Sequence, residues 1–238
     1  MKNVLITGGS RGIGRCIAEL LSENGYKVAF TYKNSENEAK SLAERIGALA
    51  IRADSLLEED VKMAVRVVGE ALGGIDFLVN NAAISGFSLL TDLSLDSWNE
   101  TLGVSLTGAF LYSREVLPSM IRKKQGRIVN ISSMWGMVGA SCEVHYSAAK
   151  AGLIGFTKAL AKEVGPSGIT VNAIAPGLIN TEMNGALSSE DKSAIVDETP
   201  LCRIGEPIDV ARAVLFLLGE GGSFITGEVI NVSGGLVI

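Results

Sequence analysis

The amino-acid sequence predicts an α/β fold, in which one doubly wound parallel sheet of about seven strands is covered by helices on both faces. Two observations carry this prediction. Short runs of aliphatic and β-branched residues alternate with stretches of helical periodicity along the chain. Hydrophobic residues make up 47% of the composition but aromatic residues only 5%, which is typical of buried parallel strands built from Val, Ile, Leu and Ala. The length of 238 residues fits a single domain over residues 1–238.

The order of the elements supports parallel pairing of the strands. Helical spacing fills the intervals between the expected strands, for example at Val61, Val65 and Val68. Because a parallel strand is reached through a crossover helix, this alternation predicts right-handed connections. The least regular stretch, residues 177–200, follows the sixth strand, and we expect it to form a lid at the ligand-binding edge of the sheet. The expected strands span residues 4–7, 27–32, 48–52, 77–80, 127–132, 170–174 and 228–232.

A glycine-rich turn, residues 7–14, joins the first strand to the first helix and reads TGGSRGIG. Glycine allows the backbone to turn sharply and to approach a pyrophosphate closely. The following helix then offers free N–H groups and the positive end of its dipole to the anion. We therefore expect a Rossmann-type dinucleotide site. Its expected contacts in the turn are Gly8, Ser10, Arg11, Gly12, Ile13 and Gly14.

The end of the second strand indicates which dinucleotide is bound. An NAD site usually has an acidic side chain there, which binds the ribose 2′-hydroxyl. Here Tyr32 and Lys33 stand at that point with no acid beside them, and Arg11 lies in the glycine-rich turn. Two cations without a carboxylate suit the 2′-phosphate of NADP(H). The alternative for Lys33 is a solvated cation in a loop.

Tyr146, Lys150 and Ser133 form the candidate catalytic set. Tyr146 and Lys150 are four residues apart at the start of a helical stretch, so they share one helix face. We expect the ammonium to lower the pKa of the phenol, which could then donate a proton to a carbonyl oxygen while a hydride reaches the carbon. Ser133 closes the fifth strand, where its hydroxyl could hold the same oxygen. A Tyr-x-x-x-Lys pair alone would be an ordinary helix pair; the combination predicts carbonyl reduction.

Taken together, these motifs resemble the short-chain dehydrogenase/reductase family over essentially the whole chain. The family patterns TGxxxGxG, NNAG and PG correspond to residues 7–14, 80–83 and 176–177. The resemblance implies that Asp54 and Ser55 border the adenine, and that Lys150 binds the hydroxyls of the nicotinamide ribose. It also implies that the cofactor cleft is lined by Asn81, Ala82, Pro176, Gly177, Ile179 and Thr181.

Two residues depart from the family pattern. Ala83 replaces a glycine near the cofactor, and we expect little effect from one added methyl group. Ser105 stands where the resemblance implies a catalytic asparagine, which helps to hold a water that relays protons to the lysine. Serine can bind a water but is shorter and has a single donor. Ser105 is therefore expected to join the catalytic set with an altered proton relay.

Three functions remain open. Within the family, the chain looks most similar to bacterial 3-oxoacyl-[acyl-carrier-protein] reductases of fatty acid synthesis. The segment from Trp135 to Tyr146 instead resembles reductases that complete the aminopentanone modification on elongation factor P, and it should wall the substrate pocket. In that segment we expect Glu143 to be a solvated acid, with contact to an amine of the substrate as the alternative. A third reading is a catalytically weak nucleotide-binding sensor, supported by Ser105 and opposed by the intact catalytic set.

The partner predictions follow from charge and from the resemblance. A basic cluster, Arg122, Lys123, Lys124 and Arg127, is interpreted as a helix C-terminus whose cations complement the dipole, with a dock for an acidic acyl carrier protein as the alternative. The resemblance implies a homotetramer, with helices near residues 96–122 and 145–163 forming one interface.

Composition and charge argue against other functional classes. The net charge of −5 disfavours nucleic-acid binding, and no segment approaches the about 20 apolar residues of a membrane helix. The three cysteines are odd in number and lack a CxxC spacing, as expected for reduced thiols in a cytoplasmic protein. His145 is the only histidine and no cluster of metal ligands is present, so we expect no metal site.

Overall fold

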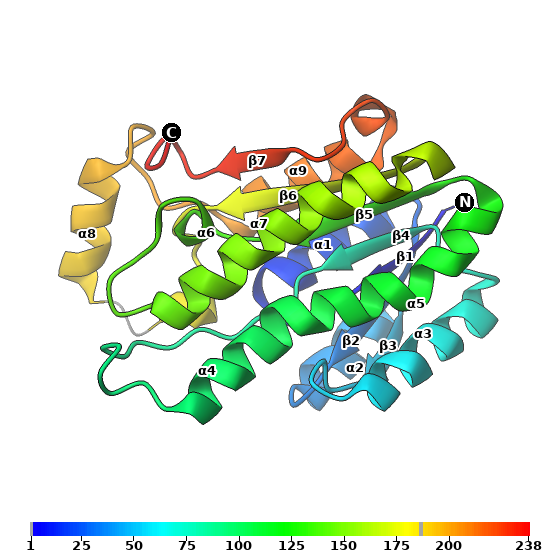
Figure 1. The fold of residues 1–238 in the computed structure, drawn as a ribbon, viewed down its shortest axis with the longest axis horizontal. Helices are drawn as coiled ribbons and strands as arrows, with labels where there is room; N and C mark the ends of the chain where they lie inside the picture. Colours follow the sequence, from blue (N-terminus) through cyan, green and yellow to red (C-terminus); the bar gives the residue numbers. More distant parts are fainter. Residues whose placement is uncertain (1, 186–187) are drawn as a thin grey trace.

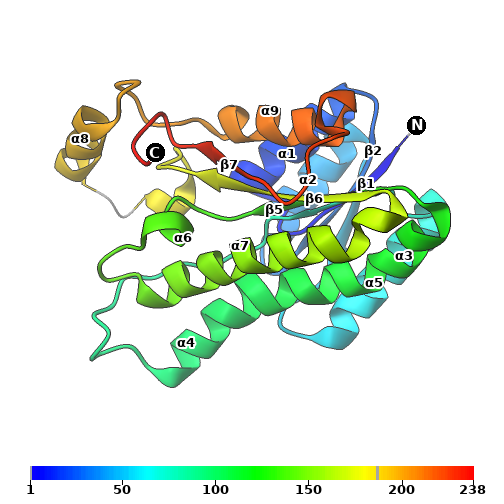
Figure 2. The same ribbon diagram turned by 45° about the horizontal axis from the view of Figure 1, so that its top comes forward.

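A seven-stranded parallel sheet forms the centre of the computed structural model, which describes residues 2–185 and 188–238. The strands run in the order β3-β2-β1-β4-β5-β6-β7, and helices cover both faces (Figures 1 and 2). The predicted doubly wound fold is therefore confirmed. The strands are β1 (Asn3–Ile6), β2 (Lys27–Tyr32), β3 (Leu49–Arg52), β4 (Phe77–Asn80), β5 (Gly126–Ile131), β6 (Ile169–Pro176) and β7 (Val229–Val232).

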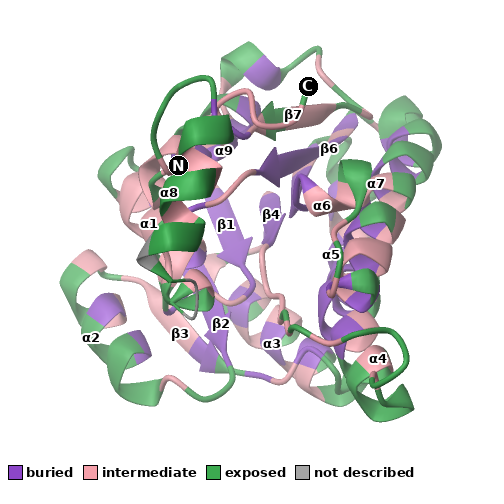
Figure 3. Ribbon diagram, turned by 90° about the vertical axis from the view of Figure 1, so that its left-hand side faces the viewer, coloured by how far each residue is buried: buried purple, intermediate pink, exposed green. Residues whose placement is uncertain are grey.

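Two hydrophobic clusters, one on each face, hold the helices to the sheet. On one face the strands pack against α1, α2 and α9, and on the other the same strands pack against α3, α5 and α7. The central strands are buried while the helices keep exposed outer sides (Figure 3). The helices of eight or more residues are α1 (Gly12–Glu23), α2 (Glu36–Ile46), α3 (Glu58–Leu72), α4 (Leu95–Leu102), α5 (Gly108–Lys123), α7 (Val144–Val164), α8 (Ser189–Glu198) and α9 (Pro207–Leu218).

The site lies where the strand order reverses. β1 pairs with β2 on one side and with β4 on the other, so that Ile6 lies opposite both Phe30 and Val79. The connections from β1 and β4 leave toward opposite faces of the sheet at this point. A crevice must then open at the carboxyl ends of these two strands, which is where ligands bind in sheets of this kind.

The stretch after β6 is more regular than the sequence indicates. A short 3₁₀ turn, Glu182–Asn184, and the helix α8 occupy it, while residues 186–187 lie outside the described residues. Ser188 and Asp191 form a reciprocal cap, in which each backbone N–H donates to the other's side chain at 3.1 Å. The apolar residues of α8 do not gather on one side, so helical periodicity could not reveal it. Its role as a lid stays a prediction.

The basic cluster lies near the amino end of β5, opposite the end at which the crevice opens. Arg122 and Lys123 stand in the last turn of α5, and Lys124 ends it in a left-handed conformation with φ of 51°. Lys123 pairs with Asp76 at 3.2 Å, and Arg127 donates to the Leu217 carbonyl at 2.9 Å. Since β5 begins here and ends at the crevice, a carrier bound to this cluster would lie at the opposite end of the strands from the crevice. The interpretation as a helix C-terminus is favoured.

Buried amides connect the two central strands to the helices above them. Asn80 Nδ2 donates to Asn130 Oδ1 at 2.8 Å and to Ser113 Oγ at 3.2 Å. Asn130 Nδ2 donates to Thr157 Oγ1 at 2.8 Å, and that hydroxyl donates to the Leu153 carbonyl at 2.7 Å. The network joins β4 and β5 to α5 and α7, the elements from which the site is built.

Replacing Asn130 by Ala should destabilise the protein. Asn130→Ala removes the bond that Asn80 donates to it and the bond that it donates to Thr157, two buried hydrogen bonds worth about 1 kcal/mol each. We expect the free energy of unfolding, measured by urea denaturation, to fall by at least about 2 kcal/mol. Thr157→Val is the control for coupling: its effect should be smaller when Asn130 is already Ala. Strictly additive effects would contradict the network.

Candidate active site

A cleft of about 970 Å³ opens at the carboxyl ends of the strands. Nearly every residue proposed from the sequence borders it, from the glycine-rich turn to the segment after β6. Ser105 is the exception. The lining includes Gly8, Ser10, Arg11, Gly12, Ile13, Gly14, Tyr32, Lys33, Asp54, Ser55, Asn81, Ala82, Ser133, Tyr146, Lys150, Pro176, Gly177, Ile179 and Thr181.

The glycine-rich turn is packed so closely that it requires glycine. A Cβ atom on Gly14 would lie 2.3 Å from the carbonyl oxygen of Gly8 and 2.5 Å from Asn81 Nδ2. Gly8 and Gly12 have positive φ angles of 65° and 52°. Asn81 Nδ2 donates to the carbonyls of Thr7 and Gly8, each at 3.0 Å, which ties the end of β4 to this turn.

The start of α1 fits the pyrophosphate of a dinucleotide. The helix begins at Gly12, and its N-cap residue, Arg11, makes no side-chain capping bond. The first N–H groups of the helix therefore point into the cleft without a competing side-chain acceptor. Together with the positive end of the helix dipole, they suit a bound anion. The residues present thus fit the predicted dinucleotide, with the turn holding the diphosphate.

Both cations predicted to bind a 2′-phosphate lie at the cleft and pair with carboxylates. Lys33 Nζ lies 2.8 Å from Asp54 Oδ2, and Arg11 Nη1 lies 3.3 Å from Glu182 Oε2. Burial acts to raise the pKa of Asp54, but the hydrogen bonds from Lys33 and from the Leu56 N–H lower it below its usual value. Sequence reasoning missed Glu182, because it lies on a 3₁₀ turn that is far along the chain from Arg11.

The three residues of the catalytic set converge from two elements. Ser133 follows β5, while Tyr146 and Lys150 lie on the first turns of α7. Lys150 is only 2% exposed, and its Nζ donates to the carbonyl oxygen of Ile131 at 2.7 Å. The same Nζ is 5.5 Å from the centre of the Tyr146 ring. Ser132 Oγ donates to the Lys150 carbonyl at 2.9 Å, which adds a second bond between strand end and helix.

The pKa values of Tyr146 and Lys150 differ from those expected from the sequence, because both groups are buried. Burial raises the pKa of Tyr146 to about 12, although a hydrogen bond with Ser133 acts in the opposite direction. Burial lowers the pKa of Lys150 to about 7. The expectation that the lysine ammonium lowers the pKa of the phenol is therefore not met, because desolvation is the largest effect on both groups. Tyr146 is held protonated, as a proton donor requires.

Ser105 lies away from the cleft wall. It is 2% exposed and sits in a π-helical turn, Gly103–Thr107, between α4 and α5. Its Oγ is one of the buried side-chain atoms without a hydrogen-bond partner in the described part of the chain. Such π turns often mark functional positions in helices. The role of Ser105 in a proton relay stays a prediction.

The segment before Tyr146 walls the other end of the cleft. Trp135 begins the short helix α6 (Trp135–Val138), and Trp135, Ala140 and Glu143 all line the cleft. The expectation that Glu143 is a solvated loop acid is wrong, because it is only 7% exposed. Phe87, from the loop after β4, also borders the cleft and was not identified from the sequence. Its apolar character in a loop was the available signal.

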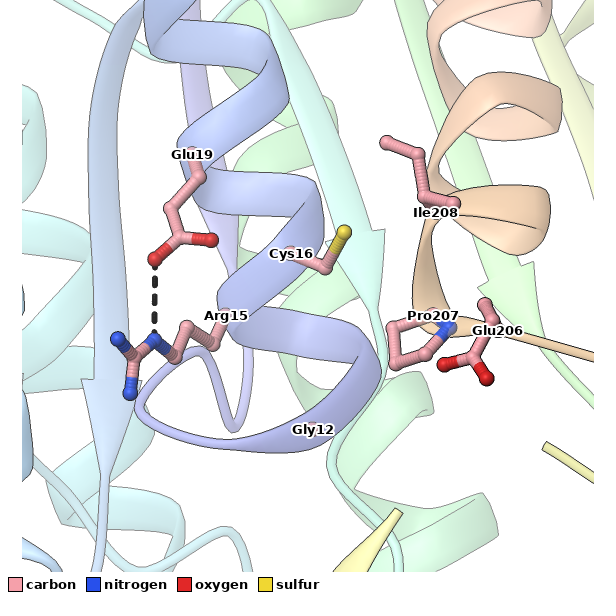
Figure 4. A pocket seen from close by; sticks show the side chains of 7 residues that line it. All are labelled: Gly12, Arg15, Cys16, Glu19, Glu206, Pro207 and Ile208. Carbon is pink, nitrogen blue, oxygen red and sulfur yellow. Dashed lines mark hydrogen bonds and ion pairs between the residues drawn. The ribbon is translucent and has the colours of Figure 1, made fainter. Parts of the chain in front are cut away.

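A second, smaller hollow of about 410 Å³ lies between α1 and α9 (Figure 4). Arg15, Cys16 and Glu19 border it from α1, and Glu206 to Ile208 border it from the start of α9. In Figure 4 Arg15 bonds to Glu19, and the sulfur of Cys16 points toward α9. Of the predicted site residues only Gly12 reaches this hollow, so the chemistry belongs to the larger cleft.

Over residues 2–185 and 188–238, no group of three or more His, Cys, Asp or Glu side chains is arranged to hold a metal ion. In the same part of the chain, no helix combines the length and apolar character needed to cross a membrane.

Comparison with known proteins finds a family model and several relatives that each match nearly the whole chain. The family described as Enoyl-(Acyl carrier protein) reductase matches residues 8–237. The chain is 47% identical to the 3-oxoacyl-[acyl-carrier-protein] reductase FabG of Aquifex aeolicus, over 98% of this chain and 96% of that one. It is 41% identical to FabG of Vibrio cholerae, over 99% and 97% of the two chains. It is 40% identical to FabG of Staphylococcus epidermidis, over 99% and 98%.

Gly14→Ala should abolish dinucleotide binding while a matched substitution does not. The added Cβ must displace the Gly8 carbonyl or the Asn81 amide, which shifts the turn that holds the diphosphate. We expect the affinity for NADPH, measured by calorimetry, to fall by at least about tenfold, the effect of 1.4 kcal/mol. Gly69→Ala in α3 is the control, since its Cβ meets nothing within 4 Å. Unchanged binding by Gly14→Ala would refute the assigned cradle.

Proposed function

This chain belongs to the short-chain dehydrogenase/reductase family, and from that premise we propose that it uses NADPH to reduce a ketone to an alcohol. The observation that carries the proposal is the convergence of Ser133, Tyr146 and Lys150 on the same cleft as the glycine-rich turn. A serine, a protonated phenol and a buried lysine beside a dinucleotide cradle serve hydride transfer to a carbonyl.

The proposed reaction divides into hydride addition and proton transfer. When bound, the nicotinamide supplies the hydride that adds to the carbonyl carbon. The Ser133 hydroxyl donates a hydrogen bond to the carbonyl oxygen, and Tyr146 gives that oxygen its phenolic proton, which completes the alcohol. Lys150, fixed by the Ile131 carbonyl, binds the ribose hydroxyls and supports return of a proton to Tyr146. Ser105 is proposed to act in that return path.

NADPH is proposed over NADH because of the charges beside the adenosine end of the cleft. Arg11 and Lys33 border the cleft with side chains about half exposed, so a phosphate can reach both. Each now pairs with a carboxylate, and a 2′-phosphate would compete with Glu182 and Asp54 for these cations. We propose that the other residues expected to bind the cofactor contact the remaining parts of the dinucleotide.

The relatives favour a 3-oxoacyl thioester carried on acyl carrier protein as the substrate. A second candidate, the aminopentanone group on elongation factor P, is supported by Trp135, Ala140 and Glu143, which line the same cleft as Tyr146. We also propose that the protein works in the cytoplasm as a homotetramer. We expect the carbonyl substrate and its carrier to be the partners, and we expect the protein to bind neither nucleic acid nor a membrane.

Tyr146→Phe should remove activity without removing cofactor binding. The change deletes only the hydroxyl, and general-acid catalysis contributes about 10²–10⁴-fold. We expect NADPH oxidation with acetoacetyl-coenzyme A, followed by absorbance, to fall by at least about 10²-fold, with NADPH affinity retained. Tyr26→Phe, a ring packed 6.0 Å from Phe77, is the matched control. An active Tyr146→Phe enzyme would exclude Tyr146 as donor, and wild-type protein that binds NADPH but reduces no ketone would favour a sensor.

Removing the two cations should change cofactor preference. In Arg11→Ala/Lys33→Ala the 2′-phosphate loses two charge-assisted hydrogen bonds, each about 1.5–3 kcal/mol. We expect the KM for NADPH to rise at least about tenfold while the KM for NADH stays the same. Lys40→Ala, an exposed cation that pairs with Glu36 on α2, is the control. A parallel loss with both cofactors would contradict the assigned phosphate contacts.

A further inference from the structure

Glu143 is a largely enclosed residue whose carboxylate has no hydrogen-bond or ion-pair partner among the described residues and faces the cleft. It is 7% exposed and lines the cleft. It occupies the N-cap position of α7, yet its side chain makes no capping bond to the helix. Burial raises its pKa, and no neighbouring cation or N–H group in the described residues acts to lower it. A carboxyl group in such a place is costly unless a ligand pairs with it.

The position of Glu143 brings it close to the reacting carbonyl. Glu143 directly precedes α7 and Tyr146 lies in its first turn, and both residues line the same cleft. The charge of Glu143 reaches the phenol, where it contributes to the raised pKa of Tyr146. A substrate whose carbonyl meets Tyr146 must therefore place its neighbouring atoms near this carboxylate.

No cation of the described cleft is available to Glu143. Arg11 pairs with Glu182 and Lys33 with Asp54. The amine of Lys150 donates to the Ile131 carbonyl, and burial brings its pKa down to about 7. The partner that would satisfy Glu143 must therefore come with the ligand.

We propose that Glu143 binds a protonated amine of the substrate, so that the ketone reduced here carries a cation a short chain away from its carbonyl. This inference rests on the proposed ketone reduction, and it favours the second substrate candidate, an amine-bearing ketone, over a simple 3-oxoacyl thioester. An ammonium N–H donates to the carboxylate in a charge-assisted hydrogen bond, the stronger kind in a partly dry cleft. The acyl chain of a simple 3-oxoacyl thioester has no group that would do this.

Two ketones of the same shape test the proposal. 5-(Dimethylamino)pentan-2-one is protonated at neutral pH, and 6-methylheptan-2-one replaces its N–H by C–H. With wild-type protein and NADPH we expect kcat/KM to favour the amino ketone by about tenfold to a hundredfold, as for a hydrogen bond between charged groups. Acetoacetyl-coenzyme A serves as the thioester in the same assay.

Glu143→Gln keeps the size of the side chain and removes its charge. It should cancel the preference for the amino ketone by lowering its kcat/KM, and it should not lower the kcat/KM for 6-methylheptan-2-one, because the carboxylate makes no favourable contact with a neutral ketone. Glu163→Gln, an exposed carboxylate near the other end of α7, is the matched control and should retain the preference. Calorimetric binding of the amino alcohol product should weaken in Glu143→Gln alone, which gives a readout independent of turnover.

The outcomes separate the inference from the reaction on which it rests. Equal kcat/KM for the two matched ketones in the wild-type protein would overturn the inference and leave ketone reduction standing. An equal fall for both ketones in Glu143→Gln would also overturn it, because it would show a structural role. Reduction of none of the three carbonyl compounds would overturn the proposed reaction together with the inference.

Discussion

The hydrogen bond from Lys150 to the carbonyl of Ile131, 2.7 Å long, determines the geometry on which the rest of the site depends. It joins the first turns of α7 to the end of β5 inside the protein, where no water competes for either group. Because Tyr146 and Ser133 are each a few residues from one end of this bond, the phenol and the hydroxyl are brought to the same side of the cleft. The buried chain Asn80–Asn130–Thr157 holds the same two elements together further down.

The parts of the fold that could be predicted are those set by local pattern. The strands and the first helix followed from apolar runs and from the glycine-rich turn, where Gly8 and Gly12 have positive φ angles that are a local property of the backbone. Helix α8 was missed because it has no apolar face, and the Ser188–Asp191 cap was the one local signal that could have indicated it.

The protonation of the site could not be predicted for a different reason. Spacing shows that Tyr146 and Lys150 share a face, but the direction of their pKa shifts depends on how completely other elements enclose them. The same holds for Glu143, which looks like a loop acid in sequence and is buried only because α6, α7 and the loop after β4 meet around it. Desolvation is a property of the packed structure and leaves no local signal in the sequence.

The electrostatics of the cleft links recognition of the substrate to the proton donor. While Glu143 is ionised and unpaired, its charge raises the cost of leaving Tyr146 as a phenolate, which opposes proton donation. An ammonium bound to Glu143 would cancel that charge and reduce the opposition just when the carbonyl is in place. A neutral ketone would reach the same phenol without this compensation. Selection of a cationic ketone would then appear in the chemical step as well as in binding, since the interaction strengthens as negative charge develops on the phenol oxygen.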